Sequence, residues 1–535
     1  MKMKKIPPTN RKRGEAGRRP PLESRLAVVT PIFQSFYIEE PKLVFGSGQL
    51  TVDPKAGLEA YGPFGWENQP GKTVQIGVIG TGTGIQSFLN FLETCQSPVK
   101  PGLNNRRKPL DPHTHPDFPG CNRDQSFRCQ FVSNNRSLHR TIHEDLFAKA
   151  VANATEEANI RAVVDLVIRE LKALNDLEPG PDVVVVLLPP DVEHEVAHVG
   201  AAMARRKISF SPRERFLAKL KKEETKGQGL LGLDFDLGIE SKQDGYWNIH
   251  HAFKAHAMQF DIPTQLVWES TLREEHLSSV AWNLFTALYY KAGNNPWRLQ
   301  LLPDNTCYVG IGFYKERPFG KSDMHTSLAQ VFGAGEGIVL QGGKAVVDKL
   351  RGDNKPHLTE ISAETLITTA IERYTLQHGA GPARVVVHKT SRYWPEEIKG
   401  LKKGLQGIYH YDLLAFGDLD TRFMRLGKRP VLRGTAVLLA KHYYLLFTNG
   451  YIPYLRSYPS KRIPRPLEIL EHHGASTPYT VCAEILSLTK LNWNSCSFGS
   501  SLPITIRFSK DVGRVLAELP KDGRIKAQSK YRFYM

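Results

Sequence analysis

Apolar and polar positions alternate between two periods in the first half of the chain. Residues 73–95 give an apolar run, a glycine turn and a helix-like repeat, and residues 158–174 give a stronger helical repeat. The run PDVVVVLLPP at 181–190 is apolar without interruption, which is typical of a strand buried on both faces of a parallel sheet. The pattern predicts a doubly wound α/β unit that ends near residue 296.

The last part of this unit combines helical periodicity with charged residues. Residues 245–260 predict a helix, residues 264–267 a strand, and residues 278–293 a second helix. His250 and Lys254 are four residues apart and share one helix face, and Gln265 opens the strand. Lys291 falls on the apolar stripe of the second helix. Because a lysine on a buried face is costly without an anion, the four residues are predicted to bind one small anion.

From residue 297 the order of elements changes. A longer strand at 307–315 and a hairpin-like stretch up to residue 347 come first. A helix at 359–377, a strand at 384–388, a helix after Pro395 and strands through 435–454 follow, and helices near 479–489 and 510–519 close the chain. Paired strands followed by strands that alternate with helices are the order of an RNase H-like fold.

Charge and cysteine content narrow the class of protein. The 535 residues carry a net charge of +17, of which residues 2–25 supply +7 from nine Lys/Arg against two Glu. We expect a disordered basic arm at 1–26 and a polyanionic partner, which charge alone does not define as nucleic acid or acidic protein. Six unpatterned cysteines, no signal sequence and no membrane-spanning run predict a cytoplasmic protein.

The quartet His250, Lys254, Gln265 and Lys291 resembles the 5′-phosphate pocket of the MID domain in Argonaute and PIWI proteins. The second half fits the PIWI domain of the same family. The resemblance implies an α/β fold, with a Rossmann-like MID domain within residues 27–296 and an RNase H-like PIWI domain at 297–535. It also implies that the terminal carboxylate of Met535 enters the pocket, where a structural Mg²⁺ joins it at the guide phosphate.

Two positions of the PIWI metal site lack the expected acids. Gly312 stands where the family places the first aspartate, and Lys389 follows the strand that should precede the second. Without carboxylates, two-metal cleavage of a phosphodiester is not supported. Glu316 lies close to the same strand and has two interpretations. It is either a substitute for the first acid or a solvated turn residue, and the second is favoured.

A basic and aromatic segment resembles the guide-strand groove of the family. Cations alternate with tyrosines and prolines over residues 448–469. This pattern is typical either of contacts with the backbone and bases of a strand or of a loop held by prolines. A second piece follows near residue 490. The predicted groove residues are Arg456, Lys461, Arg462, Arg465, Lys490 and Asn492.

Two other motifs favour structural interpretations. Gly80, Gly82 and Gly84 give GxGxG after a strand, but the full dinucleotide fingerprint and its acidic residue are missing, so a tight turn is the better interpretation. A group of two histidines and two cysteines has no common zinc spacing, and a zinc site is the weaker alternative for His113, His115, Cys121 and Cys129.

The resemblance is to short prokaryotic Argonautes, since only about 70 residues precede the first α/β unit. It implies a non-cleaving protein that holds a guide RNA and senses complementary single-stranded DNA. It further implies activation, with possible higher assembly, of an APAZ-containing partner with a TIR, sirtuin-like or nuclease effector. The alternatives are a guide-directed metal-dependent nuclease that acts alone and, more remotely, a nucleotide-dependent oxidoreductase.

Overall fold

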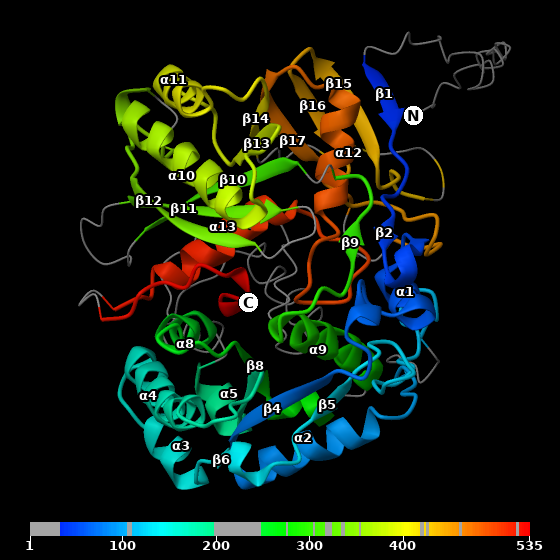
Figure 1. Ribbon diagram of the computed structural model, residues 1–535, viewed down its shortest axis with the longest axis vertical. Coiled ribbons are helices and arrows are strands. Elements are labelled where there is room, and N and C mark those ends of the chain that lie inside the picture. The colour runs from blue at the N-terminus through cyan, green and yellow to red at the C-terminus, as the bar shows by residue number, and fades with distance from the viewer. Residues whose placement is uncertain are drawn as a thin grey trace, which may run out of the picture.

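The computed structural model places two α/β lobes one above the other (Figure 1). The basic arm at 1–26 and the connector at 197–247 lie outside the described residues. No helix within the described part of the chain is long and apolar enough to cross a membrane. The structure describes residues 33–103, 110–196, 248–273, 276–302, 305–315, 324–332, 337–351, 355–417, 422–423, 427, 429–458, 463–520 and 524–535.

The first lobe is built on a parallel sheet. Its central strand β4 (Thr73–Gly80) pairs with β5 (Gln130–Val132) and β6 (His139–Thr141) on one side and with β7 (Val183–Leu188) on the other, and β7 pairs with β8 (Thr264–Trp268). Every residue of β7 is buried. The uninterrupted apolar run therefore has the cause predicted from the sequence, which is burial on both sheet faces.

Helices cover both faces of this sheet. α2 (Gly82–Thr94) and α9 (Leu277–Lys291) pack on one face. On the other face lie α3 (Glu144–Ala150), α4 (Glu156–Asn175) and α8 (Ile249–Ala257), while α5 (Pro190–Val196) packs beside α4. This is the Rossmann-like arrangement predicted for the MID domain.

The glycine turn before α2 is closed by a protein carboxylate. Thr81 caps the helix by accepting from the Gly84 amide at 2.9 Å, and its hydroxyl donates to Glu269 Oε1 at 2.8 Å. A side chain on Gly84 would collide with Glu269, so the carboxylate already sits against the helix N-terminus. These contacts favour the interpretation as a tight turn rather than as a dinucleotide-binding site.

The second lobe contains a nine-stranded sheet. Its order is β1-β15-β16-β17-β14-β13-β10-β11-β12, with β10, β13 and β14 parallel and the other pairs antiparallel. The part β12-β11-β10-β13-β14 has the strand order of the RNase H-like fold predicted for the PIWI domain. The bounds are β1 (Gln34–Tyr37), β10 (Thr306–Lys315), β11 (Met324–Phe332), β12 (Ile338–Lys344), β13 (Arg384–Lys389), β14 (His410–Gly417), β15 (Thr435–Ala440), β16 (Tyr443–Leu446) and β17 (Leu467–Gly474).

Helices also sandwich this sheet. α10 (Glu360–His378) and α11 (Pro395–Gly404) share a core on one face, and α12 (Pro478–Leu488) and α13 (Ile504–Leu516) pack on the other. α13 approaches β10 so closely that a Cβ on Gly312 would lie 2.6 Å from Ser509 Cβ. Glycine is therefore required in this strand for packing.

The strand pair β14 and β17 was not predicted as two strands. Asp412 on β14 and Glu468 and His472 on β17 are buried, so polar residues interrupt the apolar pattern. His472 Nε2 contacts Asp412 Oδ1 at 2.8 Å, and Arg384 binds the same carboxylate at 2.6 Å. These cross-strand partners satisfy charges that the sequence alone leaves unpaired.

The N-terminal segment reaches the second lobe, so the range 27–296, expected to hold the N-terminal segment and the MID domain, includes one strand of the second sheet. β1 is the edge strand of the nine-stranded sheet, with Gln34 opposite Leu438. β2 (Leu43–Val44) then pairs with β3 (Leu50–Thr51) and β9 (Arg298–Leu299) in a small sheet. Strands this short carry little pattern, so only tertiary pairing reveals their partners.

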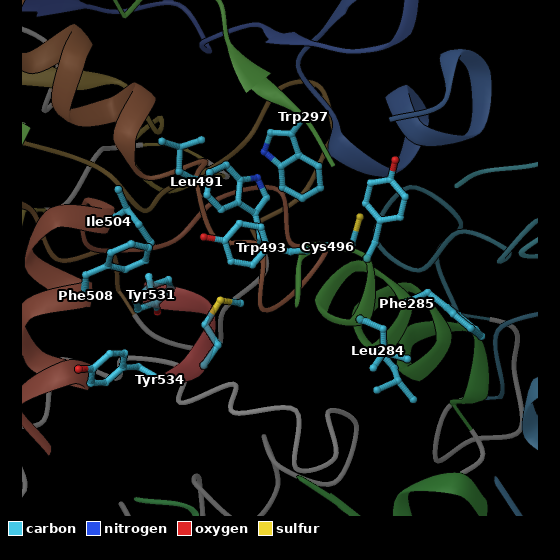
Figure 2. Close-up of a cluster of buried hydrophobic side chains, with 14 of the residues drawn as sticks. Leu284, Phe285, Trp297, Leu491, Trp493, Cys496, Ile504, Phe508, Tyr531 and Tyr534 are labelled. Atoms are coloured by element: carbon cyan, nitrogen blue, oxygen red, sulfur yellow. The ribbon is translucent and has the colours of Figure 1, made fainter. Parts of the chain in front are cut away.

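A shared core joins the two lobes (Figure 2). Leu284 and Phe285 from α9 belong to the same buried cluster as Trp493, Phe508 and other residues of the second lobe. Tyr290 of α9 stacks on Trp493 with ring centroids 4.7 Å apart. The lobes are thus held by apolar burial, which fixes the end of α9 relative to the C-terminal helices.

A buried ion cluster fixes the N-terminal segment to the second lobe. Glu40 binds Arg433 at 3.0 Å and Lys490 at 2.8 Å. Lys490 also donates to Val52 O at 2.7 Å. One carboxylate therefore balances two buried cations from distant parts of the chain.

Glu40→Gln is expected to lower the free energy of unfolding by roughly 2–4 kcal/mol, because it leaves two buried cations without a counter-charge. Denaturant unfolding measures the change. Glu39→Gln is the matched control, since Glu39 is exposed. Equal stability of the two variants would contradict the assigned role.

Candidate anion-binding site

The helix α8 presents two of the predicted residues from one face. Asn248 caps it by accepting from the His250 amide at 2.8 Å, and Ile249 and Phe253 anchor its other face in the core of the first lobe. His250 and Lys254 follow one turn apart on this anchored helix. The helix confirms the segment predicted from periodicity, within the residues that are described.

Lys254 is completely buried and satisfied only by neutral oxygens. Its Nζ donates to the carbonyl of Thr264 and to Thr264 Oγ1, the latter at 3.1 Å. It forms no ion pair with a described carboxylate. Thr264 was missed by the sequence reasoning, and its place directly before Gln265 at the start of β8 was the available signal.

Lys291 and Gln265 meet from α9 and β8. Lys291 Nζ donates to Gln265 Oε1 at 2.5 Å, and Gln265 Nε2 donates to Leu266 O at 3.0 Å. Both side chains are buried, with exposures of 1% and 2%. The backbone bond fixes the amide so that its oxygen faces the lysine.

The two lysines converge on each other. Burial lowers the pKa of Lys254 to about 7, with an opposing contribution from its contact with Lys291. Burial and the adjacent Lys254 lower the pKa of Lys291 strongly, and burial together with both lysines lowers the pKa of His250. An anion placed here would relieve the repulsion and recharge the amines, so the geometry suits a phosphate.

The C-terminal residues pack near α8 and α9, the two helices that carry the lysines. Met535 is 3% exposed and belongs to the shared core with Tyr531, Phe533 and Tyr534. The chain ends between α13, α8 and α9 (Figure 1). The predicted entry of the Met535 carboxylate into the pocket stays a prediction. The pocket side chains themselves are cations, an imidazole and an amide, and they do not fit a divalent metal without an added anion.

The two degenerate PIWI positions are filled by packing and by an internal ion pair. Gly312 lies against Ser509 of α13. Lys389 is fully buried, with Nζ 2.7 Å from the Glu397 carboxylate, which His357 Nδ1 contacts at 3.0 Å. Among the residues that the structure describes, no three His, Cys, Asp or Glu side chains gather where they could hold a metal. Glu316 lies outside those residues.

Burial and hydrogen bonding compete at Glu397. Burial opposes the charge on this carboxyl, but its bonds to His357 and its contact with Lys389 hold its pKa below the ordinary value. The ring of His357 stacks on Trp394 with centroids 3.8 Å apart. Lys389 is thus a charged member of a packed internal network.

The predicted groove is corrected at one end. Lys490 was predicted to contact nucleic acid, but its side chain is fully buried in the ion cluster with Glu40. Asn492 is also buried and donates to Ser495 Oγ at 3.0 Å. Both residues are buried and have structural contacts, so they offer little surface to a strand.

The other end of the groove remains available in part. Arg456 is exposed and has a left-handed backbone, with φ of 49°, while Arg465 is half-buried. Lys461 and Arg462 lie outside the described residues. Their role in strand binding stays a prediction.

The zinc alternative does not fit the structure. Cys121 and Cys129 are buried in the core of the first lobe, whereas His113 is exposed in a turn. Burial raises the pKa of the Cys129 thiol to about 12. A thiol held in its neutral form is a poor metal ligand.

The two lobes have the Rossmann-like and RNase H-like arrangements expected of MID and PIWI domains. The chain is similar to protein argonaute of Aquifex aeolicus (strain VF5), with 22% identity over 265 residues, which is 48% of this chain and 34% of that protein. The resemblance to Argonautes that the sequence indicates is confirmed as homology over this region. No protein-family model matches the chain.

Solved Argonaute structures share the fold. Clostridium butyricum Argonaute, bound to a guide DNA and a 19-mer target DNA, matches 92% of this chain and 54% of its own with TM-score 0.60 and 14% identity. For Marinitoga piezophila Argonaute in complex with a 5′ OH guide RNA, the match covers 94% of this chain and 59% of that protein, with TM-score 0.52 and 10% identity. For Drosophila Piwi, the match covers 94% of this chain and 56% of that protein, with TM-score 0.53 and 13% identity. The chain therefore spans little more than half the length of these proteins.

Lys254→Met is expected to stabilise the protein at pH 7, because it removes a buried amine. Between pH 7 and about 10, the unfolded chain holds the proton that folded Lys254 has lost, so stability from this group rises with pH. The variant should lose that slope and gain roughly 2–4 °C in thermal midpoint for each kcal/mol recovered. Thermal unfolding from pH 7 to 9 measures both effects.

The exposed Lys172 provides the control, since Lys172→Met should leave the pH slope unchanged. A lower midpoint for Lys254→Met than for this control would contradict the cost assigned to the buried amine.

Proposed function

We propose that the chain binds the 5′-phosphorylated end of a guide strand and uses the guide to sense a complementary strand. The observation that carries this proposal is the convergence of Lys254 and Lys291 beside Gln265. Neither amine has an acidic partner among the described residues, so an anionic ligand supplies the missing counter-charge.

The proposal adopts an RNA guide and a single-stranded DNA target from the family resemblance. Proteins of the same fold bind different guides, since the Clostridium butyricum structure contains a guide DNA and the Marinitoga piezophila structure a 5′ OH guide RNA. The fold therefore does not decide the end group. The two buried amines favour a phosphate over a hydroxyl, because only the phosphate carries charge.

The double variant Lys254→Met, Lys291→Met is expected to weaken binding of a 5′-phosphorylated guide RNA about 100-fold. This estimate takes about 1.5 kcal/mol for each of the two charged hydrogen bonds that are lost. The affinity for a 5′-hydroxyl guide should change less than about threefold, because this guide lacks the terminal charge. Fluorescence anisotropy with matched guides measures both, with an otherwise identical guide DNA as a third ligand.

The double variant of two exposed lysines, Lys149→Met with Lys172→Met, controls for the loss of net charge. Equal weakening of phosphorylated and hydroxylated guides by the pocket variant would refute the proposed phosphate contact.

We further propose that the chain does not cleave its target. The glycine at 312 packs against α13, and Lys389 places a cation beside Glu397 at the position where the resemblance expects a metal-binding acid. Neither position offers the carboxylate that two-metal cleavage requires, and the nearby Glu397 carboxylate is already paired with Lys389. The rival function is a metal-dependent nuclease that recruits acids from other positions.

The effector activity is proposed to belong to an APAZ-containing partner with a TIR, sirtuin-like or nuclease domain. The family resemblance supports this part of the proposal. Guide–target pairing would act by favouring the active state of the complex, which requires that the two states differ in affinity for the paired strands. A structural Mg²⁺ at the guide phosphate belongs to the same family expectation.

The purified chain with a phosphorylated guide, a complementary strand and Mg²⁺ or Mn²⁺ is expected to leave the target intact. Addition of the APAZ partner should produce effector activity only when guide and target are both present. Gel analysis of the labelled target and an assay of the partner's reaction give the two readouts. Cleavage at one fixed position by the chain alone would establish the rival nuclease.

A further inference from the structure

A cavity lies in the first lobe, apart from the lysine pair. It has a volume of about 190 Å³ and lies among the segment before β4, the loop that leads into β5 and the residues that follow α9. Lys254, Gln265 and Lys291 do not line it. The lining residues are Phe64, Gly65, Trp66, Asn68, Gln69, Lys72, Arg128, Cys129, Tyr289, Gly293, Asn294 and Asn295.

Two cations face this cavity, and no acidic side chain lines it. Lys72 Nζ donates to the amide oxygens of Gln69 at 2.8 Å and Asn294 at 2.6 Å. Arg128 donates through Nη1 to the carbonyl of Asp124. Neither Lys72 nor Arg128 forms an ion pair with any carboxylate in the described residues, so the positive charge of the cavity is not balanced by the protein.

Arg128 is held in an unfavourable conformation. Its backbone lies in the left-handed region with φ of 51°, which costs free energy for a residue with a Cβ. Its Nε is buried and has no hydrogen-bond partner in the described structure. Both features cost free energy in the folded protein, and both are consistent with a side chain placed for a ligand.

The rest of the lining suits a planar, polar ring. Trp66, Phe64 and Tyr289 supply aromatic surface, and the guanidinium of Arg128 lies 5.8 Å from the centroid of the Trp66 ring. Side-chain amides from Asn68 and Gln69 add donors and acceptors. Aromatic faces beside cations and amides are the groups that stack on a nucleobase and bind its phosphate.

We propose that this cavity binds a phosphorylated nucleoside, with the phosphate at Lys72 and Arg128 and the base against Trp66. The site is additional to the guide-end pocket and does not depend on the function proposed for it. Its ligand is either a free mononucleotide or one nucleotide of a bound strand, which share this chemistry.

Titration calorimetry with AMP on the full chain tests the site, in a Lys254→Met, Lys291→Met background that disables the other pocket. AMP is expected to bind this protein, and adenosine at least tenfold more weakly. Arg128→Gln should weaken the binding of AMP at least tenfold. Arg161→Gln, a charge-matched change on α4 outside the cavity, should have no effect.

Arg128→Gly separates binding from folding, because glycine adopts the left-handed backbone without strain. It should lose AMP binding and keep or raise the thermal midpoint. A lower midpoint for Arg128→Gly would assign Arg128 a structural role and overturn the proposal.

The source of the nucleotide follows from photocrosslinking of a 5-iodouridine-labelled guide–target duplex. Crosslinks to Trp66 that AMP competes away assign the site to a strand nucleotide. AMP binding without such crosslinks assigns it to a free nucleotide. Absence of both, or equal AMP affinity in Arg128→Gln and Arg161→Gln, overturns the proposal, while guide binding through Lys254 and Lys291 is measured separately.

Discussion

The cost of burying two amines without an acid is the constraint around which the anion-binding site is organised. Lys254 and Lys291 lie at contacting positions on α8 and α9, and among the described residues Thr264 and Gln265 accept their hydrogen bonds. Neutral oxygens satisfy the donors but do not remove the charge repulsion. The packing of the helices therefore holds the two amines close together, and an anion is the group that would balance their charge.

The packing that maintains this state comes from both lobes. α9 carries Lys291 at its last turn and also contributes Leu284 and Tyr290 to the core shared with the second lobe. Movement between the lobes would disrupt this core, which contains several large aromatic side chains. The position of Lys291 is thus determined by residues far from the pocket, and the C-terminal residues beside it are ordered by the same contacts.

The second lobe handles buried charge differently. Lys389 has Glu397 as an internal counter-ion, and Lys490 and Arg433 share Glu40. Each of these cations contacts a carboxylate of the protein itself, with Arg433 and Lys490 sharing one. The contrast separates structural from binding lysines among residues that are all buried: a cation with its own carboxylate stabilises the fold, whereas a cation without one requires something from outside.

The sequence alone determined the two-lobe fold class and the order of the quartet, because helix and strand periods and the spacing His250, Lys254, Gln265, Lys291 are local properties. Tertiary structure decided which charges are available. The burial of Lys490 against Glu40, the pairing of β1 with β15 and the cavity around Lys72 and Arg128 each join segments tens to hundreds of residues apart. A contact of that kind depends on how the elements pack against one another. The local pattern of residues in the sequence does not reveal it.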